Sequence, residues 1–256
     1  MAERIEVQVP DGYPPMCEPV KPENRAENLV IVAASDKYLA AMAESFEKSY
    51  PKAIFDMITK PSEKTYTADT VKRLSATLGA PNVTMLVVTT LGNESQFMGC
   101  AAFLKAVLTP SNEHPMHIFR PSAFHRGHNF KKLMSWTDRE VDEMHKGMNT
   151  ELLETILEHQ QRQREKLMGS QPYVMLGPIW VPNEYRSRGV SSKLISKGFD
   201  MARDSRVPLL LSGVFPNAKP AYLHLGFEPL EGYDDLMIWF PQTIARGKVQ
   251  DGRLVY

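Results

Sequence analysis

Hydrophobic residues recur along the chain at two spacings, which predict a fold that mixes strands with helices. Short unbroken apolar runs are typical of buried strands, whereas apolar residues spaced three or four apart are typical of a helix with one buried face. The apolar runs predict strands over residues 29–33, 83–90, 96–105, 173–181, 208–212 and 236–240. The helical spacings predict helices over residues 38–50, 68–78, 218–224 and from about 190 to 205.

The strand predicted over residues 173–181 carries an irregularity in its interior. Gly177 and Pro178 lie at its centre. Because proline has no N–H group, it cannot donate a hydrogen bond to a neighbouring strand, so a regular central strand is disfavoured here. Two interpretations remain open, a break that separates this strand from its neighbour and a simple kink of an edge strand.

Residues 107–170 separate the third and fourth predicted strands and follow a different pattern. Their first half shows no clear period and is predicted to be loop. Thr137 and Glu140 then form a capping box, and an apolar stripe follows as one long helix or as two helices broken near residues 147–150. We therefore expect an extended N-terminal arm (1–28), a single domain (29–240) that contains this helical insertion, and a C-terminal tail (241–256).

The overall composition and charge of the chain do not point to a particular binding partner, so the partner has to be inferred from local motifs. The 256 residues are 43% hydrophobic and 23% charged, and 30 basic residues balance 30 acidic ones. A chain without net charge has no global field that attracts nucleic acid or an anionic membrane. We expect neither as a partner, and we expect a monomer or a homodimer.

Cysteine and histidine spacing predicts neither disulfides nor a metal site. Cys17 and Cys100 are too few for a disulfide framework. Four histidines of the insertion, which are His114, His117, His125 and His128, have no cysteines or paired acids beside them, so no metal is expected. The N-terminus has no apolar signal segment and no run approaches the ~18 apolar residues of a membrane span, which predicts a cytoplasmic protein.

The segment Y-R-S-R-G-V-S-S-K over residues 185–193 contains the most informative motif. It joins a predicted strand to a predicted helix, and the first N–H groups of a helix have no partner within it, so they form a binding site for an anion. The spacing Arg186-x-x-Gly189-x-Ser191 resembles the R/Q-x-x-G-x-G/A pyrophosphate loop of the GNAT superfamily, the acyl-CoA-dependent N-acetyltransferases. A surface turn with two solvated arginines is the alternative.

Two further segments carry the same resemblance in the same order. Residues 179–186 stand where family members carry I-A-V-x-P-x-Y-R, and residues 221–227, A-Y-L-H-L-G-F, are similar to the family's Y-x-x-x-G-F segment. The resemblance implies an α/β (α+β) fold whose mixed, mostly antiparallel sheet splays between strands four and five, with helices on both faces. The segments over residues 173–181 and 215–227 are most similar to fungal members.

The resemblance also implies a set of functional residues. The arm of acetyl-CoA, the co-substrate, is expected to pair with main chain at the end of strand four, and its diphosphate to bind the loop. Tyr222 aligns with the family tyrosine that protonates the departing thiolate as a general acid, or that only packs on the cofactor. The residues expected to bind acetyl-CoA are Ile179, Trp180, Val181, Arg186, Ser187, Arg188, Gly189, Val190, Ser191 and Ser192.

The sequence leaves the general base and the acceptor open. Many members carry a carboxylate on strand four, but residues 175–178 contain none, and Glu184 is placed for a surface role. Asn217 lies five residues before Tyr222, whereas the family's cofactor-contacting Asn commonly lies seven before, so that role is not transferred. We expect transfer of acetyl to the amine of a small molecule in a ternary complex. A non-catalytic acyl-CoA-binding protein and an O-acetyltransferase are the alternatives.

Overall fold

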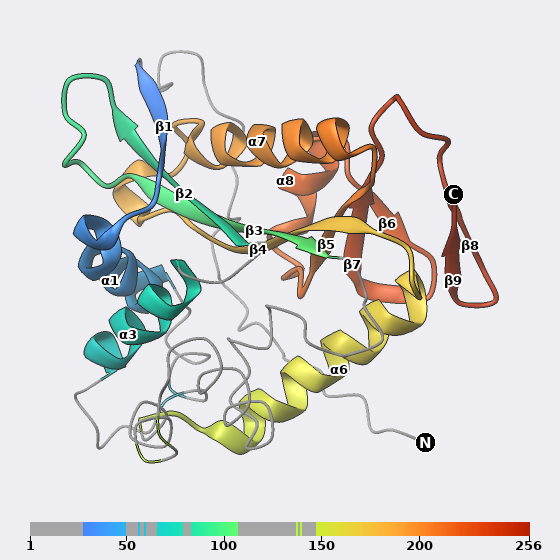
Figure 1. Cartoon of the computed structure of the whole chain (residues 1–256), viewed down its shortest axis with the longest axis horizontal. Coiled ribbons are helices and arrows are strands. Elements are labelled where there is room, and N and C mark those ends of the chain that lie inside the picture. Colours follow the sequence, from blue (N-terminus) through green and yellow to red (C-terminus); the bar gives the residue numbers. More distant parts are fainter. Residues whose placement is uncertain are drawn as a thin grey trace.

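The strands form one seven-stranded sheet in the order β1-β2-β3-β4-β5-β7-β6 (Figure 1). The computed structural model describes residues 28–49, 56, 59, 66–78, 83–106, 137, 139 and 147–256. All neighbouring strands are antiparallel except β4 and β5, which are parallel. The strands are β1 (Leu29–Ala33), β2 (Val83–Thr90), β3 (Gly99–Ala106), β4 (Tyr173–Trp180), β5 (Leu209–Ser212), β6 (Glu228–Leu230) and β7 (Tyr233–Trp239).

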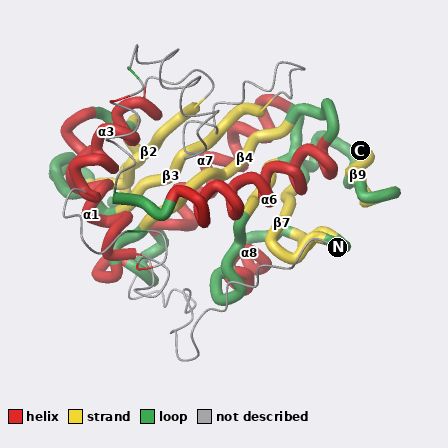
Figure 2. The backbone as a smooth tube through the Cα atoms, turned by 90° about the horizontal axis from the view of Figure 1, so that it is seen from below, coloured by secondary structure: helices red, strands yellow, loops and turns green. Residues whose placement is uncertain are grey.

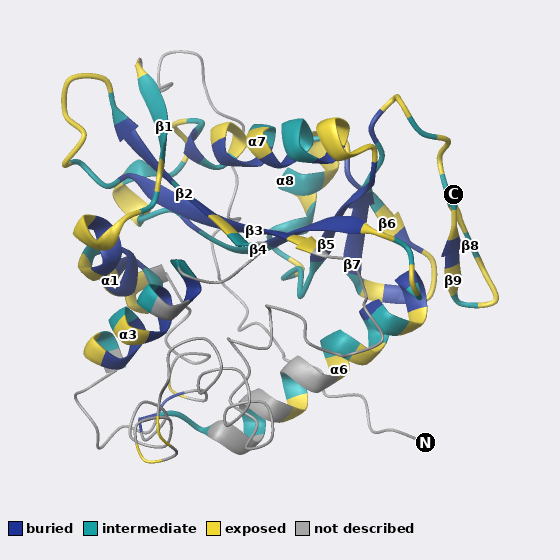
Figure 3. Cartoon of the chain, viewed as in Figure 1, coloured by how far each residue is buried: buried dark blue, intermediate teal, exposed yellow. Residues whose placement is uncertain are grey.

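Helices cover both faces of the sheet. On one face α7 runs along the strands, with its buried side toward them and its exposed side outward (Figure 3). The other face is covered by α1 and α3, which pack on each other, and by α6, which crosses the strands in Figure 2. The helices are α1 (Leu39–Ser49), α3 (Tyr66–Leu78), α6 (Thr150–Met168), α7 (Val190–Ser205) and α8 (Lys219–His224), with short 3-10 helices η2 (Asp36–Tyr38) and η4 (Asn183–Tyr185).

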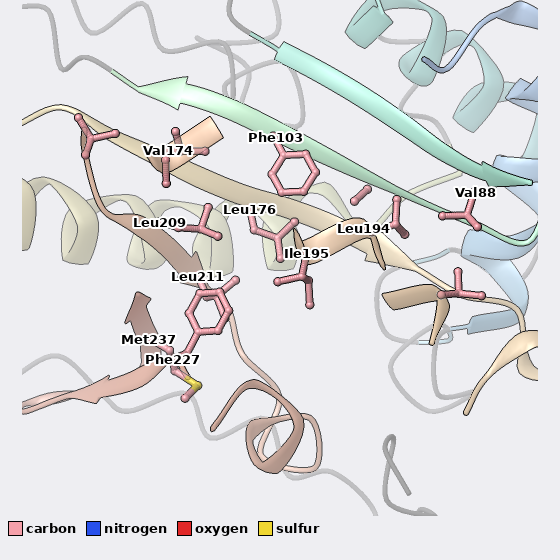
Figure 4. Close-up of a cluster of buried hydrophobic side chains, with 14 of the residues drawn as sticks. Val88, Phe103, Val174, Leu176, Leu194, Ile195, Leu209, Leu211, Phe227 and Met237 are labelled. Atoms are coloured by element: carbon pink, nitrogen blue, oxygen red, sulfur yellow. The ribbon is translucent and has the colours of Figure 1, made fainter. Parts of the chain in front are cut away.

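The α7 face holds the core cluster shown in Figure 4. Phe103 of β3 is fully buried there and lies against α7. A Cβ atom at Gly198 would lie 2.5 Å from a ring carbon of Phe103, so α7 approaches the sheet this closely only because residue 198 is glycine. Alternation along β5 places Leu209 and Leu211 in this cluster, while Leu210 belongs to the cluster on the other face.

The C-terminal residues belong to the folded domain. Strands β8 (Lys248–Gln250) and β9 (Arg253–Val255) form a hairpin whose Leu254 is fully buried in the same cluster as Leu167 of α6. The hydroxyl of Tyr256 donates to the carbonyl of Pro172 at 2.6 Å. Residues 241–256, predicted as a tail, therefore contain a packed hairpin that their alternation is too short to predict.

The strands β4 and β5 part at the point that the Gly-Pro pair predicts. They pair at Val174, Met175 and Leu176, and the pairing ends there although β4 continues to Trp180. On the β3 side, Phe103 faces Leu176 and Ala101 faces Ile179, so three steps on β4 oppose two on β3. This is a β-bulge at Gly177 and Pro178. The break is confirmed, and the edge kink is wrong because β4 is a central strand.

The predicted fold class is confirmed, with changes at the ends of elements. Strand β3 begins at Gly99 rather than residue 96, because the N–H of Gln96 closes a turn on Asn93. Helix α6 begins at Thr150, where the Asn149 side chain accepts from the N–H of Leu152, which is consistent with a break near residues 147–150. The arm (1–27), the loop predicted for the first half of the insertion (107–136), Glu140 of the predicted capping box and the stripe over 141–146 lie outside the described residues. None of the described helices is long and apolar enough to cross a bilayer.

Candidate active site

The loop between β4 and α7 presents main-chain N–H groups at the start of a helix. The short helix η4 closes on Pro182 and Asn183, and the chain then turns into α7 through Gly189. Lys193 N–H donates to the Gly189 carbonyl at 2.9 Å and is the first to find an intrahelical acceptor. The N–H groups of residues 190–192 precede it and point out of the helix end, where the helix dipole also favours an anion.

Gly189 is required by its backbone conformation. Its φ is +84°, in the left-handed region where a side chain is strained. A Cβ at this position would meet no atom within 4 Å, so the space above the loop is open. The loop is therefore shaped to let a ligand approach the main chain closely.

The side chains predicted around the loop have different surroundings. Arg186 donates from Nε to the carbonyl of Val181 at 3.2 Å, which ties the loop to the end of β4. Arg188 is exposed, and its guanidinium lies over the Tyr185 ring, 5.8 Å from the centroid. The Val190 side chain is buried in the core, so only its main chain faces the loop. Ser187 and Ser192 are exposed and Ser191 is half-buried.

Two linked hydrogen bonds hold the loop against the end of β2. The sequence did not predict them. Thr90 Oγ1 donates to Gln96 Oε1 at 2.9 Å, and Gln96 Nε2 donates to the Tyr185 hydroxyl at 3.2 Å. Gln96 and Tyr185 are 89 positions apart, so neither motif nor spacing points to this contact. It fixes η4 to the end of β2.

The end of β4 has one strand neighbour instead of two. Cys100 and Ala101 of β3 face Trp180 and Ile179, but β5 no longer pairs with this part of β4. The side chain of Trp180 is 6% exposed and packs edge-on against Phe46 of α1, with ring centroids 4.8 Å apart. The Trp180 side chain is therefore part of the core, and only the main chain of this residue is available to contact a cofactor.

Tyr222 and Asn217 lie beyond β5, on and just before α8. The ring of Tyr222 is half-buried and meets Phe227 edge-on, with centroids 5.8 Å apart. Asn217 Oδ1 is buried and has no hydrogen-bond partner in the described part of the chain. A buried carbonyl oxygen without a donor is costly, so Asn217 carries an acceptor that the described part of the chain leaves unused.

Acidic and metal-binding groups are sparse around the loop and β4. Residues 175–178 carry no carboxylate, and Glu184 is exposed on η4. Among the described residues, no three His, Cys, Asp or Glu side chains are grouped so as to hold a metal ion. The histidines at 114, 117, 125 and 128 lie outside the described residues.

The strand order, the single parallel pair and its divergence beside a glycine loop at a helix N-terminus are those of a GNAT-like fold. No family model matches the sequence, and no curated protein matches it either. Arylalkylamine N-acetyltransferase 2 from Aedes aegypti is similar in structure at 14% identity and a TM-score of 0.50, over 84% of this chain and 99% of that one. This likeness supports the fold.

Two other solved structures are similar at lower scores. One is a GNAT family acetyltransferase from Brucella melitensis in complex with acetyl-CoA, at 14% identity and a TM-score of 0.41, over 84% of this chain and 89% of that one. The other is described as histone acetyltransferase HPA2 and related acetyltransferase from Corynebacterium glutamicum, at 14% identity and a TM-score of 0.45, over 84% and 96%. The likeness to fungal members stays a prediction.

Proposed function

We propose that this protein is an acetyltransferase that moves an acetyl group from acetyl-CoA to the amine of a small molecule. The observation that carries the proposal is the opening between β4 and β5. Pairing ends at Leu176 and Leu211, while β4 continues along the gap to the phosphate-binding loop. A ligand that is anionic at one end and extended at the other, with amide groups along its length, matches this arrangement.

The residues present fit acetyl-CoA. The N–H groups of residues 190–192 and the cations Arg186 and Arg188 are suited to a diphosphate. The main chain at Ile179 and Val181 is available to the amides of the pantetheine arm. Asn217 Oδ1 is a buried acceptor without a donor, and a pantetheine N–H would satisfy it. When bound, acetyl-CoA supplies an activated acyl group, so the protein needs no covalent acyl-enzyme.

The protein then has to orient the acceptor, protonate the departing thiolate and remove a proton from the attacking amine. Tyr222 donates its hydroxyl proton to the sulfur as the carbon–sulfur bond breaks and the carbon–nitrogen bond forms. The proton lost by the amine nitrogen passes through water and restores the Tyr222 hydroxyl. The products are the N-acetylated amine and free coenzyme A, so the reaction balances without another reactant.

A thiol-release assay tests the proposal. Acetyl-CoA is offered with amino acids, polyamines, arylamines and aminoglycosides, and free coenzyme A is measured together with the mass of the acetylated product. Amine-dependent thiol release with an acetamide product is the expected result. Binding of acetyl-CoA by calorimetry without thiol release on any amine would contradict it.

The absence of a carboxylate on β4 favours a second candidate, a protein that binds acyl-CoA without catalysis. It predicts saturable binding of acetyl-CoA and no product with any acceptor. An O-acetyltransferase differs only in the acceptor, and alcohols in the same panel with product identification distinguish it.

A further inference from the structure

Arg164 is a buried cation on α6, the helix of the insertion. Its side chain is 8% exposed, and Nη1 donates to Ser212 Oγ at 2.8 Å. Tyr173 is 2% exposed, and its hydroxyl accepts a hydrogen bond from the guanidinium. Burial lowers the pKa of Arg164, yet an arginine remains charged at neutral pH. A cation is therefore held against the sheet by neutral groups.

The surroundings of Arg164 do not neutralise this charge by contact. Within the described part of the chain, no carboxylate oxygen lies within 4.0 Å of the guanidinium, and the acceptors of its hydrogen bonds are two neutral groups, Ser212 Oγ and the Tyr173 hydroxyl. Glu165 and Asp235 act on it only through longer-range attraction. A guanidinium has five N–H donors, and a buried charge without a partner is unfavourable. Two neutral acceptors do not occupy all five donors, and the remaining ones can bind a ligand.

Arg164 lies next to the point where β4 and β5 separate, which is the proposed position of the acyl group. Ser212 follows Leu211, the last residue of β5 that pairs with β4, so it stands where the two strands part. Its side chain alternates to the face of Leu210, opposite α7. A Cβ at Gly213 would lie 2.5 Å from Gln160 Nε2, so α6 closes directly over the end of β5. Arg164 therefore borders the gap on the face opposite the phosphate loop.

Asp235 places an opposite charge near this cation. It lies in an irregular part of β7, where Pro229 faces Met237 but Leu230 faces Tyr233. Asp235 is half-buried; burial raises the pKa of its carboxyl, and the attraction of His159 and Arg164 for its ionised form only partly offsets this. A cation and a carboxyl that lie near each other without forming an ion pair are complementary to a molecule that carries both charges.

We propose that Arg164 binds a carboxylate of the acceptor, so that the acceptor is an amine that also carries a carboxylate, such as an amino acid. This inference rests on the proposed acetyltransferase function. The planar fork of arginine binds a carboxylate through two parallel hydrogen bonds. In this proposal the amine end of the acceptor reaches the gap between β4 and β5.

The test compares each amino acid with its carboxamide on the unaltered protein, by thiol release. The two differ only in the anionic group, so the free acid is expected to have the higher kcat/KM by roughly a hundredfold. In Arg164→Gln this ratio is expected to fall to near one, while the Kd of acetyl-CoA stays the same. Arg203→Gln removes an exposed arginine from α7 and is the matched control, with the ratio unchanged.

The outcomes separate this inference from the proposed function. If carboxamides or simple amines are acetylated as well as the acids, the acceptor class is refuted and the acetyltransferase stands. If no amine gives thiol release, the proposed function fails first. The comparison on the unaltered protein needs no variant, so misfolding of Arg164→Gln would not weaken it. Arg164→Lys keeps the charge without the fork and is expected to give an intermediate ratio.

Discussion

A glutamate in place of Gly189 tests the phosphate loop most directly. The glycine has φ +84° and open space above its Cα, so the folded protein accepts the side chain without a clash. The cost to folding is the left-handed backbone alone, about 1–2 kcal/mol for a residue with a Cβ. The side chain, however, extends into the space where a diphosphate would lie.

The expected loss of binding follows from the charges. A carboxylate about 4 Å from one phosphate charge is repelled by about 4 kcal/mol at the effective dielectric constant of a protein surface. Each 1.4 kcal/mol changes an equilibrium constant about tenfold, so the Kd of acetyl-CoA should rise by roughly a thousandfold. Steric exclusion of the diphosphate adds to this loss.

Gly232 provides a matched control. It has φ +79°, is exposed in the turn between β6 and β7, and also has no atom within 4 Å of an added Cβ. Gly232→Glu therefore carries the same backbone penalty and the same added charge, away from the loop. Calorimetry with acetyl-CoA and denaturant unfolding on both variants separates stability from binding. Equal acetyl-CoA affinity in the two variants would refute the assignment of the diphosphate to this loop.

Three further predictions concern the acid, the C-terminal hairpin and an alkaline transition. Tyr222→Phe should lower kcat more than it changes the Kd of acetyl-CoA, and the reverse pattern would make Tyr222 a packing residue. Leu254→Ala should reduce the free energy of unfolding by about 2–5 kcal/mol, because Leu254 is fully buried; urea unfolding measures this, with exposed Leu91→Ala as the control. Burial raises the pKa of Tyr256 to about 12 from its ordinary 10.0, so its neutral form stabilises the fold below pH 10 and that contribution is lost as pH rises toward 12. Difference absorbance between wild type and Tyr256→Phe should show this late ionisation, and a midpoint near pH 10 would show that the hairpin is not docked.

The sequence predicted the parts of the fold that local chemistry determines. Gly189 marks a left-handed turn that few residues other than glycine adopt easily, and the apolar run at residues 209–211 has no polar face, as a strand covered on both sides requires. The Gly177-Pro178 pair cannot form a regular ladder, so the break in β4 also follows from the residues themselves.

The parts that the sequence did not predict depend on contacts between distant segments. Residues 160–166 are highly polar, yet Arg164 is buried, and Ser212, 48 positions away, accepts its hydrogen bond. The support of Tyr185 by Gln96 is of the same kind. Burial of a polar residue is decided by its partner, and the partner is not visible in a local pattern.

The elements on the two faces of the sheet pack on separate hydrophobic clusters, so the two proposed binding sites can vary independently. Helix α7 and the loop that precedes it pack on the cluster around Phe103, while α6 packs through Leu167 on the cluster that contains Leu254 of the hairpin. The proposed acceptor contact on α6 can therefore change without disturbing the loop that is proposed to bind acetyl-CoA. If so, substitutions at Arg164 should alter KM for the acceptor and leave the Kd of acetyl-CoA unchanged, whereas substitutions at Gly189 should do the opposite. Joint loss of both affinities in either variant would show that the two faces are coupled through the gap between β4 and β5.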